Sequence, residues 1–296
     1  MAESVAIRID DLHYRYPVFD PEQGEEPGYA LAGVSLEVAE GELLGITGTT
    51  GSGKTTLCLA LNGLVPQQTG GTIRGDVWIG DWNTKRVPIP RLATRVGVIF
   101  QDPEANLIGL TVEDEIAFGP ENLGVDPREI EERLVWALDV VGMAEARHRS
   151  ASQLSGGQKQ RIGIASVLAM LPRVLVLDEP TAELDPVGRR EITQVVADLR
   201  AREAGMTVVM VERDPDVLAR LADRVAVLDE GRIVAIDEPH RLYRDPGPLV
   251  EIGVGVPAAA WIAAGLNARS GTAFAFVEHD DALATLSGAL PETDAR

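Results

Sequence analysis

The sequence is poor in cysteine, histidine and aromatic residues. Among 296 residues it has one cysteine, Cys58, and four histidines, and its aromatic content is 4%. A single cysteine closes no disulfide within the chain and builds no multi-cysteine metal site, which is compatible with a reducing compartment without requiring one.

Basic residues are also scarce. Lys and Arg total 27 against 46 Asp and Glu, which gives a formal net charge of −19. This balance argues against a protein that coats DNA or RNA, because such proteins bind phosphates through basic surface. One local phosphate site remains compatible with it. We therefore expect no nucleic-acid partner.

Long hydrophobic runs are absent. The first 17 residues lack the basic stretch and apolar run of a secretory signal. The longest weakly polar stretch, residues 252–266, contains a proline and is shorter than the roughly 20 residues of a membrane-spanning helix. We expect a globular chain that does not itself cross a membrane. At about 150 residues per domain, its length suggests about two domains, or one large domain with an appendage.

Apolar patterning predicts strands in the first fifty residues. Residues 5–12 alternate apolar and polar side chains, which predicts an edge strand with one buried face. Residues 17–28 are rich in Pro, Gly and acid and predict a loop. Residues 33–42 predict a second strand, and the all-apolar residues 43–48 predict a strand buried in a sheet.

A glycine-rich loop follows the buried strand. Residues 48–56 are GTTGSGKTT, which fits G-x-x-x-x-G-K-[ST] and precedes a helical pattern. Such a loop binds phosphate through backbone N–H groups and the helix N-terminus, with Lys54 reaching the terminal phosphates and Thr55 ligating Mg²⁺. A plain turn is the alternative, which the Lys-Thr pair disfavours. The predicted nucleotide-binding residues here are Gly48, Thr49, Thr50, Gly51, Ser52, Gly53, Lys54, Thr55 and Thr56.

A second motif places two carboxylates after an apolar strand. Residues 174–180 are VLVLDEP, and ligands bind at the carboxyl ends of strands in open α/β sheets. Asp178 is the expected Mg²⁺ partner, and Glu179 is suited to orient or deprotonate the attacking water. Two solvated acids after a core strand are the alternative interpretation.

Between these motifs, residues 153–161 are QLSGGQKQR, and with them the chain resembles an ATP-binding cassette (ABC) ATPase over about residues 3–245. The resemblance implies an α/β fold: a P-loop NTPase cassette with an N-terminal antiparallel β portion, a helical subdomain and a small C-terminal extension. The nucleotide-binding domain would span residues 1–245, with the helical subdomain at about 102–155. Residues 246–296 would form the extension.

The same resemblance assigns roles in a head-to-tail dimer of two cassettes. Ser155 and Gly157 would donate hydrogen bonds to the γ-phosphate held by the other subunit's P-loop, and the motif around them adds Gly156 and Gln158. Taken alone, this motif could be a helix cap. The loop at 182–185 would cross the dimer interface.

Two further positions follow from the resemblance. Tyr16 would stack on adenine, although Tyr14 and Tyr16 could equally be strand aromatics. Gln101 would touch Mg²⁺ and water. The implied cofactors are ATP and Mg²⁺, with Thr55, Gln101 and Asp178 at the metal and Glu179, Gln101, Lys54 and Arg213 in catalysis.

Within the family, residues 101–124 are similar to ATPases of energy-coupling factor (ECF) importers. Residues 248–266 resemble the tail with which those ATPases dimerise, although a helix that only covers core is an alternative. Residues 272–277 suggest a strand and 280–286 a helix, with no assigned role.

The implied function is an ATP-hydrolysing subunit of an ECF-type importer for a vitamin or a transition-metal ion such as cobalt or nickel. It would lie peripherally on the cytoplasmic face of the cell membrane, with a second cassette and an integral membrane subunit as partners. An ATPase of a conventional importer and a soluble non-transport cassette protein are the alternatives.

One position departs from the family pattern. After the apolar residues 207–211 the family usually has a histidine that contacts the γ-phosphate and holds the catalytic glutamate, whereas this chain has Arg213. Arginine offers donors only and stays charged, whereas neutral imidazole both donates and accepts. We predict slower hydrolysis at this chain's own P-loop, which favours pairing with a second cassette that keeps its histidine. A tolerated replacement is the alternative.

Overall fold

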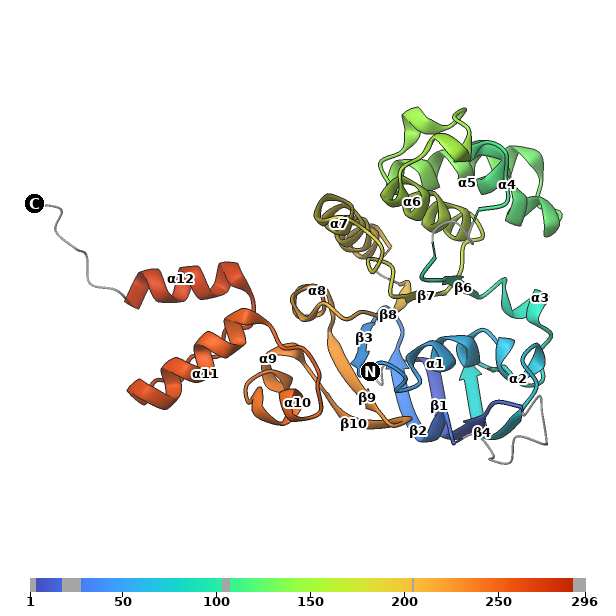
Figure 1. Ribbon diagram of the computed structural model, residues 1–296. Helices are drawn as coiled ribbons and strands as arrows, with labels where there is room; N and C mark the ends of the chain where they lie inside the picture. Colours follow the sequence, from blue (N-terminus) through green and yellow to red (C-terminus); the bar gives the residue numbers. More distant parts are fainter. Residues whose placement is uncertain (1–3, 18–27, 103–106, 204, 290–296) are drawn as a thin grey trace, which may run out of the picture.

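The computed structural model describes residues 4–17, 28–102, 107–203 and 205–289, and these form two sheets flanked by helices (Figure 1). The smaller sheet is antiparallel and has the order β2 (Leu31–Ala39), β1 (Val5–Arg15), β4 (Thr72–Ile79), β5 (Trp82–Asn83). The larger sheet has the order β10 (Arg232–Asp237), β9 (Arg224–Asp229), β3 (Leu43–Gly48), β8 (Thr207–Val211), β7 (Val174–Asp178), β6 (Val96–Ile99). Its strands are parallel except β10. The α/β cassette predicted from the sequence is confirmed.

The first strand lies inside its sheet, so the prediction of an edge strand is wrong. β1 pairs with β2 on one side and with β4 on the other. Its alternation reflects one buried face, and an inner strand of a half-exposed antiparallel sheet has the same pattern as an edge strand. Of the loop predicted at 17–28, residues 18–27 lie outside the described part of the chain.

Helix α1 (Lys54–Leu61) lies between the two sheets. Leu57, Cys58 and Leu61 are buried in a core that joins apolar side chains of the antiparallel sheet to those of β3 and β8. Burial raises the pKa of the Cys58 thiol, which keeps it protonated and inert. The helix is thus fixed from both sides, and so is the loop that leads into it.

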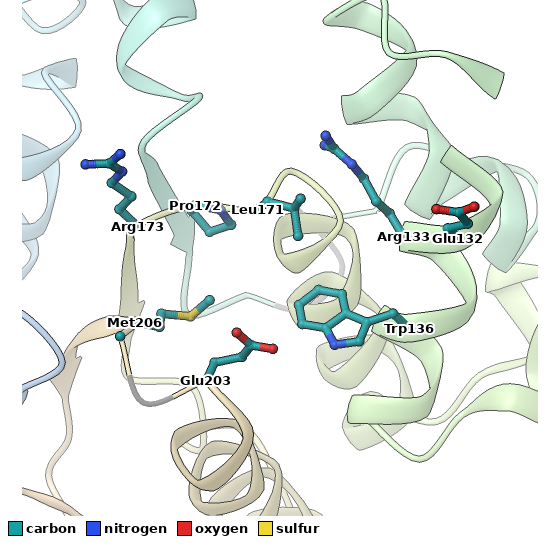
Figure 2. A pocket seen from close by; sticks show the side chains of 9 residues that line it. Glu132, Arg133, Trp136, Leu171, Pro172, Arg173, Glu203 and Met206 are labelled. Atoms are coloured by element: carbon teal, nitrogen blue, oxygen red, sulfur yellow. The ribbon is translucent and has the colours of Figure 1, made fainter. Parts of the chain in front are cut away.

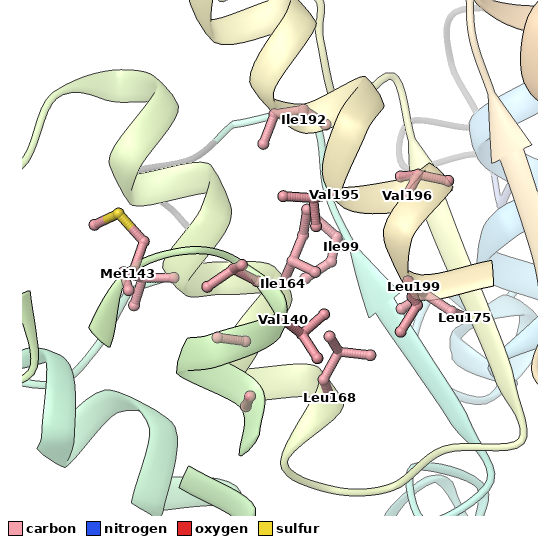
Figure 3. Packing of buried hydrophobic residues seen from close by; sticks show 14 of the residues in the cluster. Ile99, Val140, Met143, Ile164, Leu168, Leu175, Ile192, Val195, Val196 and Leu199 are labelled. Atoms are coloured by element: carbon pink, nitrogen blue, oxygen red, sulfur yellow. The ribbon is translucent and has the colours of Figure 1, made fainter. Parts of the chain in front are cut away.

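Helices α4 (Val112–Asn122), α5 (Pro127–Val140) and α6 (Gly156–Leu168) form a helical lobe to one side of the sheets (Figure 1). Buried apolar side chains pack this lobe against β6, β7 and α7 (Pro186–Arg202), among them Val140, Ile164, Ile99 and Val195 (Figure 3). The lobe therefore shares a continuous core with the larger sheet.

The remaining helices are short connections or belong to the C-terminal part. The connections are α2 (Leu64–Gln67), α3 (Ile89–Leu92), η2 (Ala144–Ala146), η3 (Ala151–Gln153) and α8 (Pro215–Leu221). The C-terminal helices are α9 (Pro239–Leu242), α10 (Gly247–Glu251), α11 (Ala258–Ser270) and α12 (His279–Ala289). Helices α11 and α12 project away from the sheets (Figure 1). None of the described helices is long and apolar enough to span a membrane.

The strand predicted at 272–277 is wrong, and the helix predicted at 280–286 is confirmed as part of α12. The described residues 272–277 form no strand and pair with none. Instead the Asn267 side chain accepts from the Phe274 backbone N–H at 2.8 Å and donates to its carbonyl at 2.8 Å. Phe276 packs into the small apolar core between α11 and α12. The Asn267 side chain therefore makes the two hydrogen bonds that a neighbouring strand would make to Phe274.

Candidate nucleotide site

The loop between β3 and α1 requires glycine at both of its ends. Gly48 has φ 150° and Gly53 has φ 102°. A Cβ at Gly48 would lie 1.9 Å from the carbonyl oxygen of Leu228, and one at Gly53 would lie 2.3 Å from that of Ala30. Neither position accommodates a side chain, so the loop packs directly on the backbone of its neighbours.

The lysine of this loop points back into it. The Lys54 ammonium is buried and donates to the carbonyl oxygens of Gly48 at 3.0 Å and Thr49 at 2.7 Å. Burial lowers the pKa of Lys54. The Ser52 hydroxyl is buried with no hydrogen-bond partner among the described residues. The loop thus presents an ammonium and an unsatisfied hydroxyl, which fits the binding of phosphate oxygens.

Both carboxylates at the end of β7 are buried, so the interpretation as two solvated acids is wrong. Burial raises the pKa of Asp178, and a hydrogen bond with Thr55 partly offsets this effect. One oxygen of Asp178, Oδ1, is buried without a hydrogen-bond partner in the described structure. A hydroxyl and a free carboxylate oxygen at this position are oxygen donors of the kind that Mg²⁺ prefers.

Arg213 joins Glu179 to the P-loop. Its Nε donates to Oε2 of Glu179 at 2.7 Å, and its Nη1 donates to the Thr50 hydroxyl at 3.4 Å. The Arg213 side chain is 56% exposed and that of Glu179 is 6% exposed. Glu179 also has φ 49°, a left-handed conformation that non-glycine residues seldom adopt. The direction of the Glu179 side chain is therefore set by its strained backbone and by the guanidinium.

Glu212 lines the same cavity as Glu179 and Arg213 and is not among the residues predicted for the site. It is buried and accepts from the Thr181 hydroxyl at 2.6 Å and from the backbone N–H groups of Arg213 at 2.7 Å and Asp214 at 3.1 Å. Burial raises its pKa. The pattern that marked Asp178, a carboxylate at the end of an apolar strand, is also present at Glu212 and could have found it.

Gln101 lies two residues after the end of β6 and borders the site of Glu179 and Arg213. With Glu179 and Arg213 it lines a cavity of about 450 Å³. The other lining residues are Thr181, Ala182, Arg189, Glu212 and Asp214. Gln101, Glu179 and Arg213 are thus brought together, and part of the loop predicted at 182–185 joins them.

Of the two tyrosines considered for adenine stacking, Tyr14 is fully buried and Tyr16 is 37% exposed. Their rings contact edge to face at a centroid distance of 4.9 Å. The Tyr16 hydroxyl also contacts the Thr56 hydroxyl at 3.1 Å, which fixes the ring beside α1. Only Tyr16 offers an accessible ring here, and its stacking role stays a prediction.

The LSGGQ motif forms the N-terminus of α6. The Ser155 hydroxyl accepts from the backbone N–H of Gln158 at 3.4 Å, and the Gln158 side chain accepts from the Ser155 N–H at 3.1 Å. Within one chain the motif is thus a capping box. Ser155 and Gly156 are exposed, and α6 lies in a different lobe from α1 (Figure 1). The structure does not bring this motif to its own P-loop.

A cavity of about 490 Å³ lies between α5 and the turns that lead into β7 and β8 (Figure 2). Trp136, Leu171, Pro172 and Met206 supply its apolar part. None of the predicted nucleotide-site residues lines it. This cavity therefore belongs to the junction of the helical lobe with the larger sheet.

Comparison with known proteins assigns the family. The family model described as ABC transporter matches residues 31–182, which include the P-loop and the two carboxylates after β7. The chain belongs to the ABC transporter family. The ATPases of this family bind and hydrolyse ATP. The cassette fold places the chain among these ATPases.

The relatives of this ABC cassette include ECF proteins. The chain is 43% identical over 263 residues to the energy-coupling factor transporter ATP-binding protein EcfA2 of Symbiobacterium thermophilum, which covers 88% of this chain and 90% of that protein. The predicted likeness to ECF ATPases is thereby confirmed.

Solved cassettes share the fold. The structure of cbiO1 from Clostridium perfringens, described as part of an ABC transporter complex, has a TM-score of 0.72 at 29% identity and covers 88% of this chain and 99% of that one. The ATP-binding cassette MJ0796, a dimer with ADP and Pi in a post-hydrolysis state, has a TM-score of 0.67 at 28% identity, with 79% and 98% covered.

Proposed function

We propose that this chain is the ATP-hydrolysing subunit of an ECF-type importer that takes up a vitamin or a transition-metal ion through a membrane partner. The observation that carries the proposal is an incomplete site. The P-loop and the buried acids Asp178 and Glu179 lie together, while Ser155 and Gly156 of the LSGGQ motif are exposed in the other lobe. The likeness to EcfA2 supports the ECF type.

Each side chain has a defined task in this account. The backbone N–H groups of residues 48–56 and the Lys54 ammonium bind the phosphates of ATP. Thr55, Asp178 and Gln101 would hold Mg²⁺, which when bound neutralises charge on the phosphates. Glu179 accepts the proton of the attacking water, and Arg213 holds Glu179 in place.

A second cassette would complete the site. The exposed start of α6 offers backbone N–H groups and the Ser155 hydroxyl, a suitable arrangement for a γ-phosphate held by another subunit. We propose that Ser155, Gly156, Gly157 and Gln158 act in this way, with residues 182–185 at the interface. The dimer known for the MJ0796 cassette supports a pair. Arg213 favours a heterodimer in which the partner keeps histidine.

The domain organisation follows from the same proposal. Residues 1–245 form the nucleotide-binding domain, about residues 102–155 its helical subdomain, against which α6 packs, and residues 246–296 a C-terminal extension that supports dimerisation. Trp261 and Ile262 of α11 are exposed and suited to that contact.

The membrane subunit would dock beside α4. Ile108 is 72% exposed and Leu110 is 84% exposed, and both precede Phe118 and Leu123, which are also exposed. Apolar side chains exposed this far and close in sequence are typical of an interaction site. The chain would then lie peripherally on the cytoplasmic face of the membrane.

Affinity purification from detergent-solubilised membranes tests this function. We expect a multispanning protein and a second cassette to co-purify with the tagged chain, as identified by mass spectrometry. Leu110→Asp should abolish recovery of the multispanning protein, whereas Leu171→Asp, at an exposed leucine bordering the cavity of Figure 2, should not. Recovery of soluble partners alone would refute the transport function.

A further inference from the structure

The C-terminal part of the chain returns to the nucleotide site between α10 and α11. An ideal Cβ on Gly255 would lie 3.6 Å from Cδ of Pro215 and 3.7 Å from the carbonyl oxygen of Arg213. One on Gly253 would lie 3.8 Å from Cγ2 of Thr49. These three residues of the extension, 253–255, therefore lie against the loop after β8 and against the P-loop at the same time.

The contact is anchored by the residue between the two glycines. Val254 is buried in an apolar cluster with Val227 of β9, Ala219 of α8 and Tyr243. Its backbone N–H donates to the carbonyl oxygen of Leu249 at 2.8 Å. The segment is thus attached to both the sheet and α8, and it cannot move without disturbing that cluster.

The Arg213 side chain is largely exposed, whereas its main chain has neighbours on two sides. Its backbone N–H is held on one side by Glu212, and its carbonyl oxygen faces Gly255 on the other. α8 begins two residues later, at Pro215. The extension therefore limits where the Arg213 main chain can lie. The main-chain position in turn determines whether the guanidinium contacts Glu179.

We infer that residues 253–255 are a positioning element for Arg213, through which the C-terminal extension sets the rate of ATP hydrolysis within its own chain. This inference rests on the proposed function, in which Arg213 holds the catalytic Glu179. It assigns to the extension a role at the nucleotide site of its own chain in addition to dimerisation.

Gly255→Leu is the direct test. The backbone at Gly255 is outside the left-handed region, so leucine is not opposed by φ. A Cβ there would meet Pro215 and the Arg213 carbonyl oxygen at ordinary contact distance, so we expect the larger leucine side chain to press on that loop. We expect kcat for ATP to fall about fivefold with KM and melting temperature unchanged, the pattern of a lost transition-state contact. Gly288→Leu, at an exposed glycine of α12 with nothing within 4 Å of its Cβ, is the matched control.

A double-mutant cycle separates positioning from a structural defect. In an Arg213→Ala background, Gly255→Leu should cause no further loss of kcat, because the side chain through which it acts is gone. Val254→Ala, which weakens the anchor, should show a smaller loss and the same dependence on Arg213. Full activity of Gly255→Leu, or an equal loss with and without Arg213, would overturn the inference. Glu179→Gln tests the proposed function separately, since it should abolish turnover whatever the extension does.

Discussion

At the scale of single residues, the pairing of Arg213 with Glu179 determines what this P-loop site is expected to do. The guanidinium donates to the carboxylate at 2.7 Å and is never an acceptor. It can therefore fix the direction of Glu179 but cannot relay a proton from it. A histidine at this position would supply both functions.

Replacements of Arg213 test this assignment. Arg213→His should raise ATP turnover about threefold, because imidazole also accepts a hydrogen bond, and Arg213→Ala should lower it about tenfold, the kinetic equivalent of about 1.4 kcal/mol. Steady-state phosphate release by the purified proteins measures both effects. A histidine variant no faster than the wild type would show that arginine is a tolerated replacement.

The buried Lys54 makes stability depend on pH. Burial lowers its pKa in the folded state below the ordinary 10.5, so the unfolded chain binds the proton more tightly. The free energy of unfolding should therefore rise with pH, relative to Lys54→Met, in the window below pH 10.5. Urea unfolding of both proteins between pH 8 and 10.5 measures this difference. A difference that stays constant across the window would contradict the assignment.

At the scale of elements, the α11–α12 pair depends on one polar side chain. Asn267 bonds both backbone groups of Phe274 and also accepts from the Thr272 hydroxyl at 2.9 Å. Asn267→Ala would leave the two partly buried backbone groups of Phe274 unsatisfied, at a cost of about 1 to 2 kcal/mol. We expect faster limited proteolysis between residues 270 and 278.

Thr285→Ala provides the control, because that hydroxyl makes only a 3.5 Å contact with Asp281 on the exposed side of α12. Its proteolysis rate should match the wild type. Equal protection of the Asn267→Ala variant would show that apolar packing alone holds the two helices.

Some elements could be predicted from the local sequence and others could not. The strands that end at Gly48 and Asp178 were predictable because each is a short apolar run followed by a residue with specific chemistry. The inner position of β1 was not, because strand order depends on partners far along the chain. The segment 272–277 has the pattern of a strand, but the backbone groups of its Phe274 bond the Asn267 side chain and not another strand.

Part of the candidate site could likewise be predicted from the local sequence, and part could not. Its motif residues are contiguous, so their spacing alone indicated the P-loop and the paired carboxylates. The contact of Gly255 with Arg213 joins residues 42 positions apart that carry no shared pattern. Glu212 had a usable pattern, but its donors, the Thr181 hydroxyl and the backbone N–H groups of Arg213 and Asp214, come together only in the folded chain.

At the scale of the whole molecule, the two lobes separate the halves of the proposed site. The P-loop and acids lie with the sheets, and the LSGGQ motif, with Ser155 and Gly156 exposed, begins a helix of the other lobe (Figure 1). A two-fold pair of cassettes would bring each motif to the other chain's P-loop and form two composite sites.

Mixing two inactive variants tests this central claim most directly. Lys54→Ala removes the phosphate-binding ammonium, and Ser155→Arg blocks the start of α6, so each protein alone should be inactive. In an equimolar mixture, half of the dimers should contain one intact composite site, which predicts about a quarter of wild-type ATP turnover. A mixture no more active than its separate components, under conditions where the wild type hydrolyses ATP, would contradict the account.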